Sequence, residues 1–258
     1  MEQAGRLPPD WILPDWPVPA WVRGVTTSRQ GGVSSPPFGS MNLAAHVGDD
    51  PAAVTENRRR LCQILALPEE PAWLVQVHGT RVVAAGEGGE GDGVLAREAG
   101  RVCAVLTADC LPVLFCNRAG SRVAAAHAGW RGLAAGVLEA TVAAMEVPGS
   151  DLLAWLGPAI GPAAFEVGEE VREALTEGHP AAEAAFHERG GHWYADLYQL
   201  ARQRLAAVGV TEVYGGGWCT HDEPERFFSY RRDGVTGRMA TLVWIEPRGA
   251  MGYHAPLS

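Results

Sequence analysis

Short runs of apolar residues alternate with turns rich in glycine, proline and asparagine along most of this chain. Runs of this kind, bounded by turn residues, are typical of β-strands. Near the middle of the chain, two of them, residues 111–116 and 123–126, are separated by the turn 117–121. A hairpin returns the chain to its starting point, so Cys110 and His127 are expected to meet at one end of it.

Further strands and helices follow from the same patterns. Strands are predicted at residues 21–28, 73–77, 81–85, 102–106, 152–156, 213–218 and 239–245. Helices are predicted at residues 51–67, 130–145, 169–177 and 197–208. This mixture, without a repeat or a linker, predicts an α+β fold: a single layered α/β domain with mixed sheets over residues 1–258. Residues 1–20, rich in proline and tryptophan, are expected to wrap around its surface.

Composition and charge exclude several classes of protein. A formal net charge of −9 argues against sequence-independent binding to nucleic acid. No stretch approaches the roughly 18 apolar residues of a membrane span. The chain has no lysine, which excludes Schiff-base and P-loop chemistry. Five cysteines do not indicate a disulfide framework, and the N-terminus lacks the pattern of a secretory signal. The expected location is therefore the cytoplasm.

Two familiar motifs are rejected. Residues 86–91 match GxGxxG, but Glu87, Glu90 and Asp92 would repel a pyrophosphate, and no helix follows. A flexible acidic turn is predicted there instead. The HxE pattern at residues 221–223 resembles part of the zinc deaminase signature, which also needs a later PCxxC, and no cysteine follows that pattern.

Three residues, His78, Cys110 and His127, each lie at the end of an apolar strand. They are either ligands of a soft metal, with a fourth position open for water, or Cys110 is a nucleophile with His127 as its base. The alternative without chemistry is a pair of hydrogen-bonded structural histidines and a buried cysteine. The neighbouring Asp109 either accepts a proton or caps a turn.

Four polar residues are candidates for binding a substrate. Arg29, Asn42 and His46 lie in or just after a long Gly/Pro/Ser loop, and loops of this length are often functional. Arg29 and Asn42 could contact ribose or phosphate, although Arg29 also suits a surface salt bridge. Arg131 lies at the predicted start of a helix beside His127, where free N–H groups favour an anion.

Several motifs stand in a recognisable order: MNLAAHVGDD at residues 41–50, VHG at 77–79, TADC at 107–110 and HAGWRG at 127–132. Shorter ones occur at residues 26–34, 56–61, 92–94 and 229–240. Together they resemble the bacterial YfiH-type family over about residues 22–245. Members of that family have been described as polyphenol oxidases, as laccase-domain proteins and as purine nucleoside phosphorylases.

The resemblance implies a zinc ion bound by His78, Cys110 and His127, and a layered fold like the toxin/YfiH-like cysteine hydrolase fold. It implies phosphorolysis of adenosine, inosine and methylthioadenosine, and hydrolytic deamination of adenosine. The partners would then be small molecules, a purine nucleoside and phosphate. A separate role that it implies is peptidoglycan editing, in which an amidase removes L-serine from UDP-muramoyl-serine.

Other functions of the same site stay open at this point. Cys110, with His127 as base, could hydrolyse an amide. A non-catalytic protein could use the metal structurally if His46 or Cys219 supplied a fourth ligand. Copper in place of zinc is disfavoured, because a multicopper phenol oxidase needs several copper centres and the chain has only eight histidines. Neither the physiological substrate nor the oligomeric state follows from the sequence.

Overall fold

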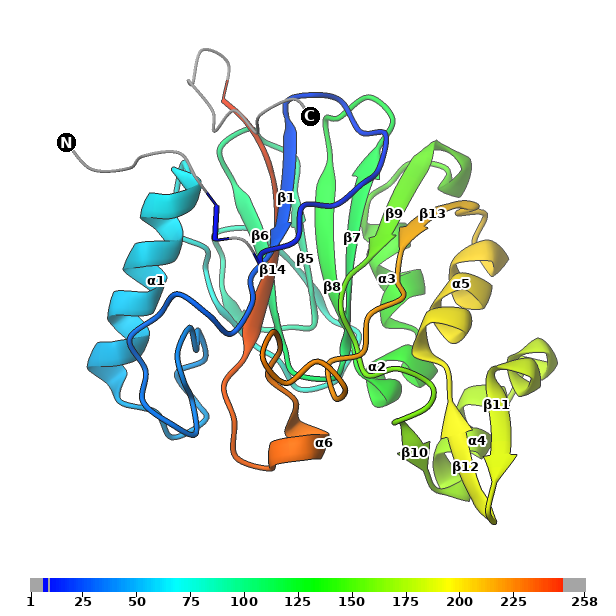
Figure 1. Ribbon diagram of the computed structural model, residues 1–258. Coiled ribbons are helices and arrows are strands. Elements are labelled where there is room, and N and C mark those ends of the chain that lie inside the picture. The colour runs from blue at the N-terminus through cyan, green and yellow to red at the C-terminus, as the bar shows by residue number, and fades with distance from the viewer. Residues whose placement is uncertain (1–6, 9, 248–258) are drawn as a thin grey trace.

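Two β-sheets packed face to face form the centre of the computed structural model, which describes residues 7–8 and 10–247 (Figure 1). The three-stranded sheet has the order β1 (Val22–Thr26), β14 (Met239–Ile245), β6 (Val102–Thr107). The six-stranded sheet has the order β13 (Glu212–Gly215), β9 (Leu152–Leu156), β7 (Leu111–Asn117), β8 (Val123–Ala128), β5 (Gly93–Ala96), β3 (Val82–Ala84). Most neighbouring strands are antiparallel, but β13 and β9 are parallel, as are β3 and β5. The α+β class with mixed sheets is therefore confirmed.

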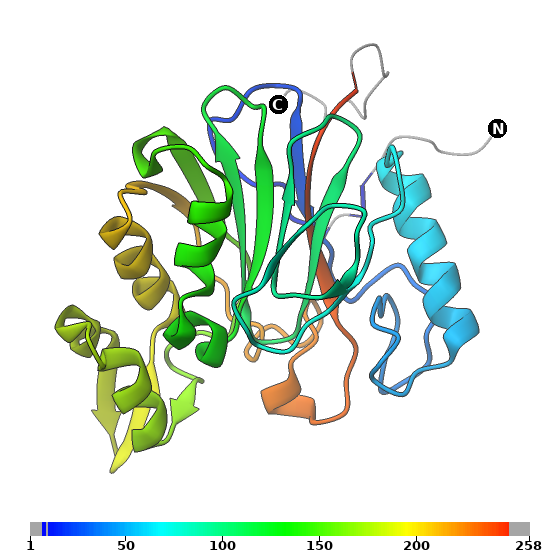
Figure 2. The same ribbon diagram turned by 180° about the vertical axis from the view of Figure 1, so that it is seen from behind.

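Helices cover the outer face of each sheet (Figures 1 and 2). The helices are α1 (Pro51–Leu65), α2 (Trp130–Ala135), α3 (Val137–Ala144), α4 (Glu169–Thr176), α5 (Leu197–Ala207) and α6 (Tyr230–Asp233). Two smaller sheets pair β2 (Leu74–Val75) with β4 (Gly89–Glu90), and β10 (Glu166–Val167) with β12 (His192–Ala195) and β11 (Phe186–Arg189). The result is four layers: α1, the three-stranded sheet, the six-stranded sheet, and the helices α3 and α5.

The alternation of side chains along β7 explains why its sequence is apolar throughout. Val113 and Phe115 face the helical layer, whereas Leu114 and Cys116 face the three-stranded sheet. All four are fully buried. A strand that is covered on both faces must be apolar at every position, because successive side chains point to opposite faces.

Local sequence signals account for several element boundaries. The Asp50 side chain accepts a hydrogen bond from the backbone of Ala52 at 2.9 Å, and Pro51 opens α1 as predicted. The prediction of one helix over residues 130–145 is wrong, because Gly136 adopts φ 97° and separates α2 from α3. Only glycine adopts this conformation without strain, and it turns the chain between the two helices.

Two other expectations need correction. The strand predicted at residues 73–77 forms only at Leu74–Val75. The segment at residues 10–20 contributes to the core as well as covering the surface, because Trp11 and Ile12 are buried and Ile12 pairs with Thr26. Residues 1–6 and 9 of the predicted surface segment lie outside the described residues. Across residues 7–8 and 10–247, no helix combines the length and the apolar character needed to cross a lipid bilayer.

Candidate active site

His78, Cys110 and His127 converge at one end of the two sheets. Their ligand atoms all lie within 4.8 Å of one another, and the Cys110 Sγ is 3.7 Å from the His78 Nε2. Cys110 immediately precedes β7, and His127 is the second-to-last residue of β8 rather than following it. His78 follows β2 and has φ 62°, an uncommon backbone conformation for a residue other than glycine. The hairpin predicted from the sequence therefore does bring its cysteine and histidine together.

The spacing of the three side chains fits a tetrahedral metal site. Zn–S and Zn–N bonds of ordinary length place a sulfur and a nitrogen ligand about 3.6 Å apart. The observed separation of Cys110 Sγ and His78 Nε2 is 3.7 Å. Gly129 leaves the room that the cluster needs, since a Cβ there would lie 2.6 Å from His78 Cδ2 and 2.9 Å from Cys110 Sγ. The donor set and its spacing both suit a soft divalent metal.

Asp92 orients both histidines. Its Oδ1 lies 2.8 Å from the His127 Nδ1, which leaves the other ring nitrogen of His127 free for a metal. The same carboxylate accepts hydrogen bonds from the backbone of Val77 (3.1 Å), His78 (3.0 Å) and Gly79 (2.7 Å). A carboxylate behind a ligating histidine fixes the tautomer and the orientation of its ring. Asp92 is fully buried, so its assignment to a flexible acidic turn is wrong.

The electrostatics of the cluster favour an ionised pair when no metal is bound. Burial alone would raise the pKa of Cys110, but the charge of His127 and hydrogen bonds from both histidines lower it to about 6. Burial would lower the pKa of His127, but the Cys110 thiolate and the Asp92 carboxylate raise it to about 9. The pKa of Asp92 is lowered because its hydrogen bonds outweigh the cost of burial. A thiolate is the form of cysteine that binds metals and attacks electrophiles.

Asp109 joins two loops through hydrogen bonds to its carboxylate. It has φ 89°, and its carboxylate accepts hydrogen bonds from the Thr220 hydroxyl and from the Arg231 backbone, each at 2.6 Å. Both carboxylate oxygens are therefore occupied, which supports the turn-capping role over proton transfer. The contact also fastens the start of α6 to the residue before Cys110.

A cavity of about 540 Å³ opens over the cluster and is lined by His46, Arg131, Arg231 and Arg238. This volume is in the usual range for a small-molecule site. The Arg131 guanidinium stacks over Trp130 at 4.3 Å and has no hydrogen bond or ion pair among the described residues. The pKa of His46 is lowered by burial and by the charges of Arg238 and Arg58, so His46 is neutral near pH 7.

The structure does not bring Arg29 or Asn42 into this cavity. Arg29 donates hydrogen bonds to the Gly39 carbonyl (3.0 Å) and the Pro224 carbonyl (2.8 Å). Asn42 is buried, and its Oδ1 accepts a hydrogen bond from the Arg238 backbone at 3.0 Å. Neither residue is among those that line the cavity, and Asn42 fixes the backbone of a cavity arginine.

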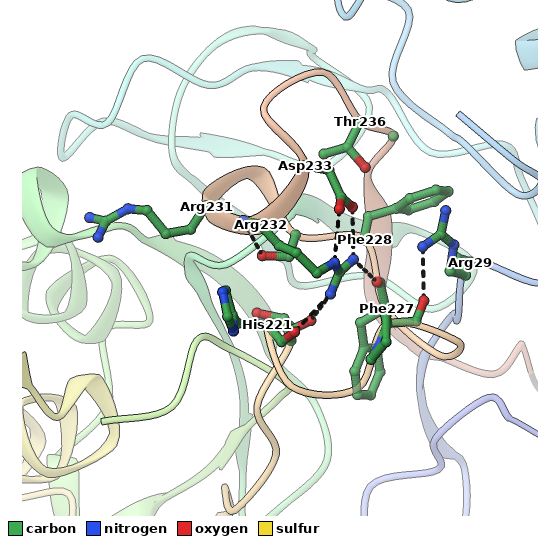
Figure 3. A network of polar contacts seen from close by, with 12 residues as sticks. Arg29, His221, Phe227, Phe228, Arg231, Arg232, Asp233 and Thr236 are labelled. Carbon is green, nitrogen blue, oxygen red and sulfur yellow. Dashed lines mark hydrogen bonds and ion pairs between the residues drawn. The ribbon is translucent and has the colours of Figure 1, made fainter. Parts of the chain in front are cut away.

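The loop at residues 219–238 carries site residues that the sequence reasoning missed. It supplies Tyr230, Arg231 and Arg238 to the cavity. Figure 3 shows how Arg232 holds this loop: its guanidinium donates to the carbonyls of Thr220, His221 and Phe227 and pairs with Asp233. The one sequence feature that pointed to these residues was the family motif at residues 229–240. That motif includes the three residues but does not show what each of them does.

Neither candidate for a fourth metal ligand joins the cluster. His46 lines the cavity but is not grouped with the three ligands, and the Cys219 Sγ accepts a hydrogen bond from the Gly161 backbone at 3.2 Å. Within the described residues, His78, Cys110 and His127 form the one group spaced for a metal. Three ligands beside a cavity are typical of a catalytic rather than a structural zinc site.

Gly129→Ala is expected to damage the cluster without unfolding the protein. The added methyl group must displace His78 or Cys110, and overpacking of this kind costs about 1–3 kcal/mol. We expect weaker metal binding in a titration against a competing chelator. The matched control is Gly79→Ala, where the nearest atoms are 3.6 Å away. Equal metal affinity in both variants would show that the cluster does not need Gly129.

Fold and site together define a class of protein: a four-layer α+β domain with a His-Cys-His group, spaced so that it could bind a metal, at one end of its central hairpin. Residues 23–246 match the family described as multi-copper polyphenol oxidoreductase laccase, and the chain belongs to this family. It is 58% identical over 244 residues to a protein of Pseudomonas aeruginosa named purine nucleoside phosphorylase, covering 93% of this chain and 98% of the relative. It is 57% identical over 238 residues to purine nucleoside phosphorylase YfiH of Escherichia coli, covering 91% and 98%.

Solved structures confirm the fold. A crystal structure of a Neisseria meningitidis protein superposes with a TM-score of 0.89 at 51% identity, covering 92% of this chain and all of that one. The structure of YlmD from Geobacillus stearothermophilus superposes with a TM-score of 0.82 at 34% identity, covering 88% and 93%. The resemblance to YfiH-type proteins found in the sequence is therefore confirmed.

Proposed function

We propose that this protein is a zinc-dependent enzyme that cleaves purine nucleosides by phosphorolysis. The observation that carries the proposal is the Arg131 guanidinium, which lines the same cavity as the His-Cys-His cluster and has no polar partner among the described residues. A cation left unpaired beside a metal site is suited to bind an anionic co-substrate. The names of the relatives agree with phosphate as that anion.

Zinc suits the cluster better than copper. One thiolate and two imidazoles, with a fourth position facing a cavity, are the ligands of catalytic zinc sites. A multicopper oxidase would need further copper centres, and residues 7–8 and 10–247 hold one cluster of suitable spacing. When bound, zinc would supply a Lewis acid that polarises an oxygen of the substrate.

In the proposed phosphorolysis, different residues of the site bind the phosphate and position the histidine. An oxygen of hydrogen phosphate attacks the anomeric carbon of the ribose, and the bond from this carbon to the purine nitrogen breaks. The leaving purine takes up the proton that the hydrogen phosphate loses. Arg131 holds the phosphate, and Arg238 adds positive charge on the cavity wall. Asp92 keeps the ring of His127 in place. Correct placement of two reactants accounts for a large share of the rate of such a reaction.

Arg131→Ala is expected to raise the KM for phosphate more than the KM for adenosine. Loss of a charge-assisted hydrogen bond costs about 1.5–3 kcal/mol, or about 10- to 150-fold in binding. Initial rates at varied phosphate and at varied adenosine separate the two constants. The control is Arg189→Ala, an arginine that lies outside the cavity and stacks on Tyr194. An unchanged KM for phosphate in Arg131→Ala would remove Arg131 from the anion site.

A second candidate function, amide hydrolysis by Cys110 as nucleophile, is favoured by the lowered pKa of this thiol. Amide hydrolysis by Cys110 would suit a substrate such as UDP-muramoyl-serine. Hydrolytic deamination of adenosine is a third reaction that the same site could support with a metal bound. Chelation separates these routes. Amide hydrolysis by a thiolate nucleophile is expected to continue after the metal is removed and to be stopped by iodoacetamide. Phosphorolysis and deamination are expected to stop on chelation and to return when zinc is added.

A further inference from the structure

Three aromatic side chains line the cavity, and they differ in how much of each ring is free. The faces of Trp130 and Phe165 are covered by the guanidinium groups of Arg131 (4.3 Å) and Arg231 (5.2 Å). Tyr230 is 59% exposed, and its one cation contact is the loosest of the three, with Arg238 at 5.9 Å. The cavity therefore offers one aromatic ring with a largely open face.

The backbone beneath Tyr230 is held firmly although its ring is exposed. The Ser229 hydroxyl accepts a hydrogen bond from the Arg232 backbone at 3.2 Å, and the Arg231 backbone donates to Asp109 at 2.6 Å. Figure 3 shows the Arg232 side chain fastening the same turn to the preceding loop. An exposed ring on a fixed backbone is preorganised to receive a flat ligand, because little freedom is lost on binding.

The position of the ring relative to the cluster is also constrained. Asp109 precedes Cys110 in the chain and bonds the residue that follows Tyr230. This one carboxylate therefore fixes the backbone next to Tyr230 relative to Cys110, and both residues line the same cavity. A ligand that reaches from the cluster to the ring would have its reacting end at the cluster and its aromatic end at Tyr230.

We propose that Tyr230 is the platform on which the purine base stacks, with Arg238 beneath the far face of the ring. This inference rests on the proposed nucleoside function and adds the orientation of the substrate: base at Tyr230, ribose toward the cluster, phosphate at Arg131. Stacking on an aromatic face tolerates changes at the edge of the base. Adenosine and inosine are therefore expected to depend on Tyr230 to the same extent.

The test compares three variants of the zinc-loaded enzyme. Tyr230→Ala is expected to raise the KM for adenosine and for inosine by about 5- to 150-fold, the range of a lost base–aromatic stack. Tyr230→Phe keeps the ring and is expected to stay within about threefold of the parent protein. Tyr230→Leu keeps apolar bulk without the ring and is expected to fall near Tyr230→Ala. The KM for phosphate should change by less than about twofold in all three.

The matched control is Val235→Ala, in the same loop and also 59% exposed but outside the cavity lining. It is expected to leave every constant unchanged. The proposal is overturned if Tyr230→Ala leaves the nucleoside KM unchanged, or if Tyr230→Phe loses as much as Tyr230→Ala. If the parent protein neither binds nor cleaves nucleosides, the proposed function fails and this inference falls with it. An active parent with an unaffected Tyr230→Ala defeats the stacking role alone.

Discussion

Cys110→Ala is expected to abolish zinc binding and nucleoside phosphorolysis together. The substitution removes the only thiolate of the cluster and leaves two histidines, which cannot complete a three-ligand site. Since the proposed reaction needs the metal to polarise its substrate, we expect the rate to fall by about 1,000-fold or more. Metal content per protein and phosphate-dependent release of adenine, measured on the same preparation, give both quantities.

The control for this substitution is Cys219→Ala. Cys219 is also partly buried and lies in a loop, but it belongs to no metal cluster. We expect this variant to keep its zinc and its activity. A Cys110→Ala protein that holds one zinc per chain and cleaves adenosine at the parent rate would contradict the account of the site. Thermal unfolding of both variants separates loss of the site from loss of the fold.

Asp92→Asn is expected to weaken zinc binding by about 10- to 100-fold, the usual effect of losing the partner of a ligating histidine. The amide keeps the volume of the carboxylate but cannot accept four hydrogen bonds from His127 and the backbone of residues 77–79 equally well. Buried donors left without an acceptor cost about 1–3 kcal/mol each, so the melting temperature should fall as well. Zinc titration against a competing chelator and a thermal melt measure the two effects.

Glu90→Gln is the matched control, because Glu90 is exposed, lies two residues away and makes the same change of charge. It is expected to change neither zinc affinity nor stability. If Asp92→Asn bound zinc as tightly as Glu90→Gln, then Asp92 would not orient the ligands, and the two histidines would be held by the backbone alone.

The elements that depend on local pattern were predictable from the sequence. The last strand, Met239–Ile245, has the predicted bounds, and the central hairpin begins at Leu111 as expected. Asp196 caps α5 through the backbone of Gln199 at 3.0 Å. Each of these features is decided by neighbours a few residues away, through strand alternation, turn residues or a side-chain cap.

The features that the sequence did not reveal depend on partners far along the chain. Asp92 looked like one acid in a glycine-rich turn, but its partner is 35 residues away at His127. Asn42 looked like a substrate contact in a long loop, but it fixes the backbone of Arg238, 196 residues away. Asp92 reaches His127 because β5 pairs with β8 within one sheet, and Asn42 reaches Arg238 because the backbone of Leu43 bonds that of Arg238. No local pattern encodes either of these long-range pairings.

The most direct test of the central claim is a product analysis of the zinc-loaded protein with adenosine, with and without phosphate. The account predicts adenine and ribosyl phosphate in equal amounts, formed only when phosphate is present, lost after chelation and restored by zinc. Formation of inosine without adenine, or no reaction of the zinc-loaded protein with phosphate present, would contradict it.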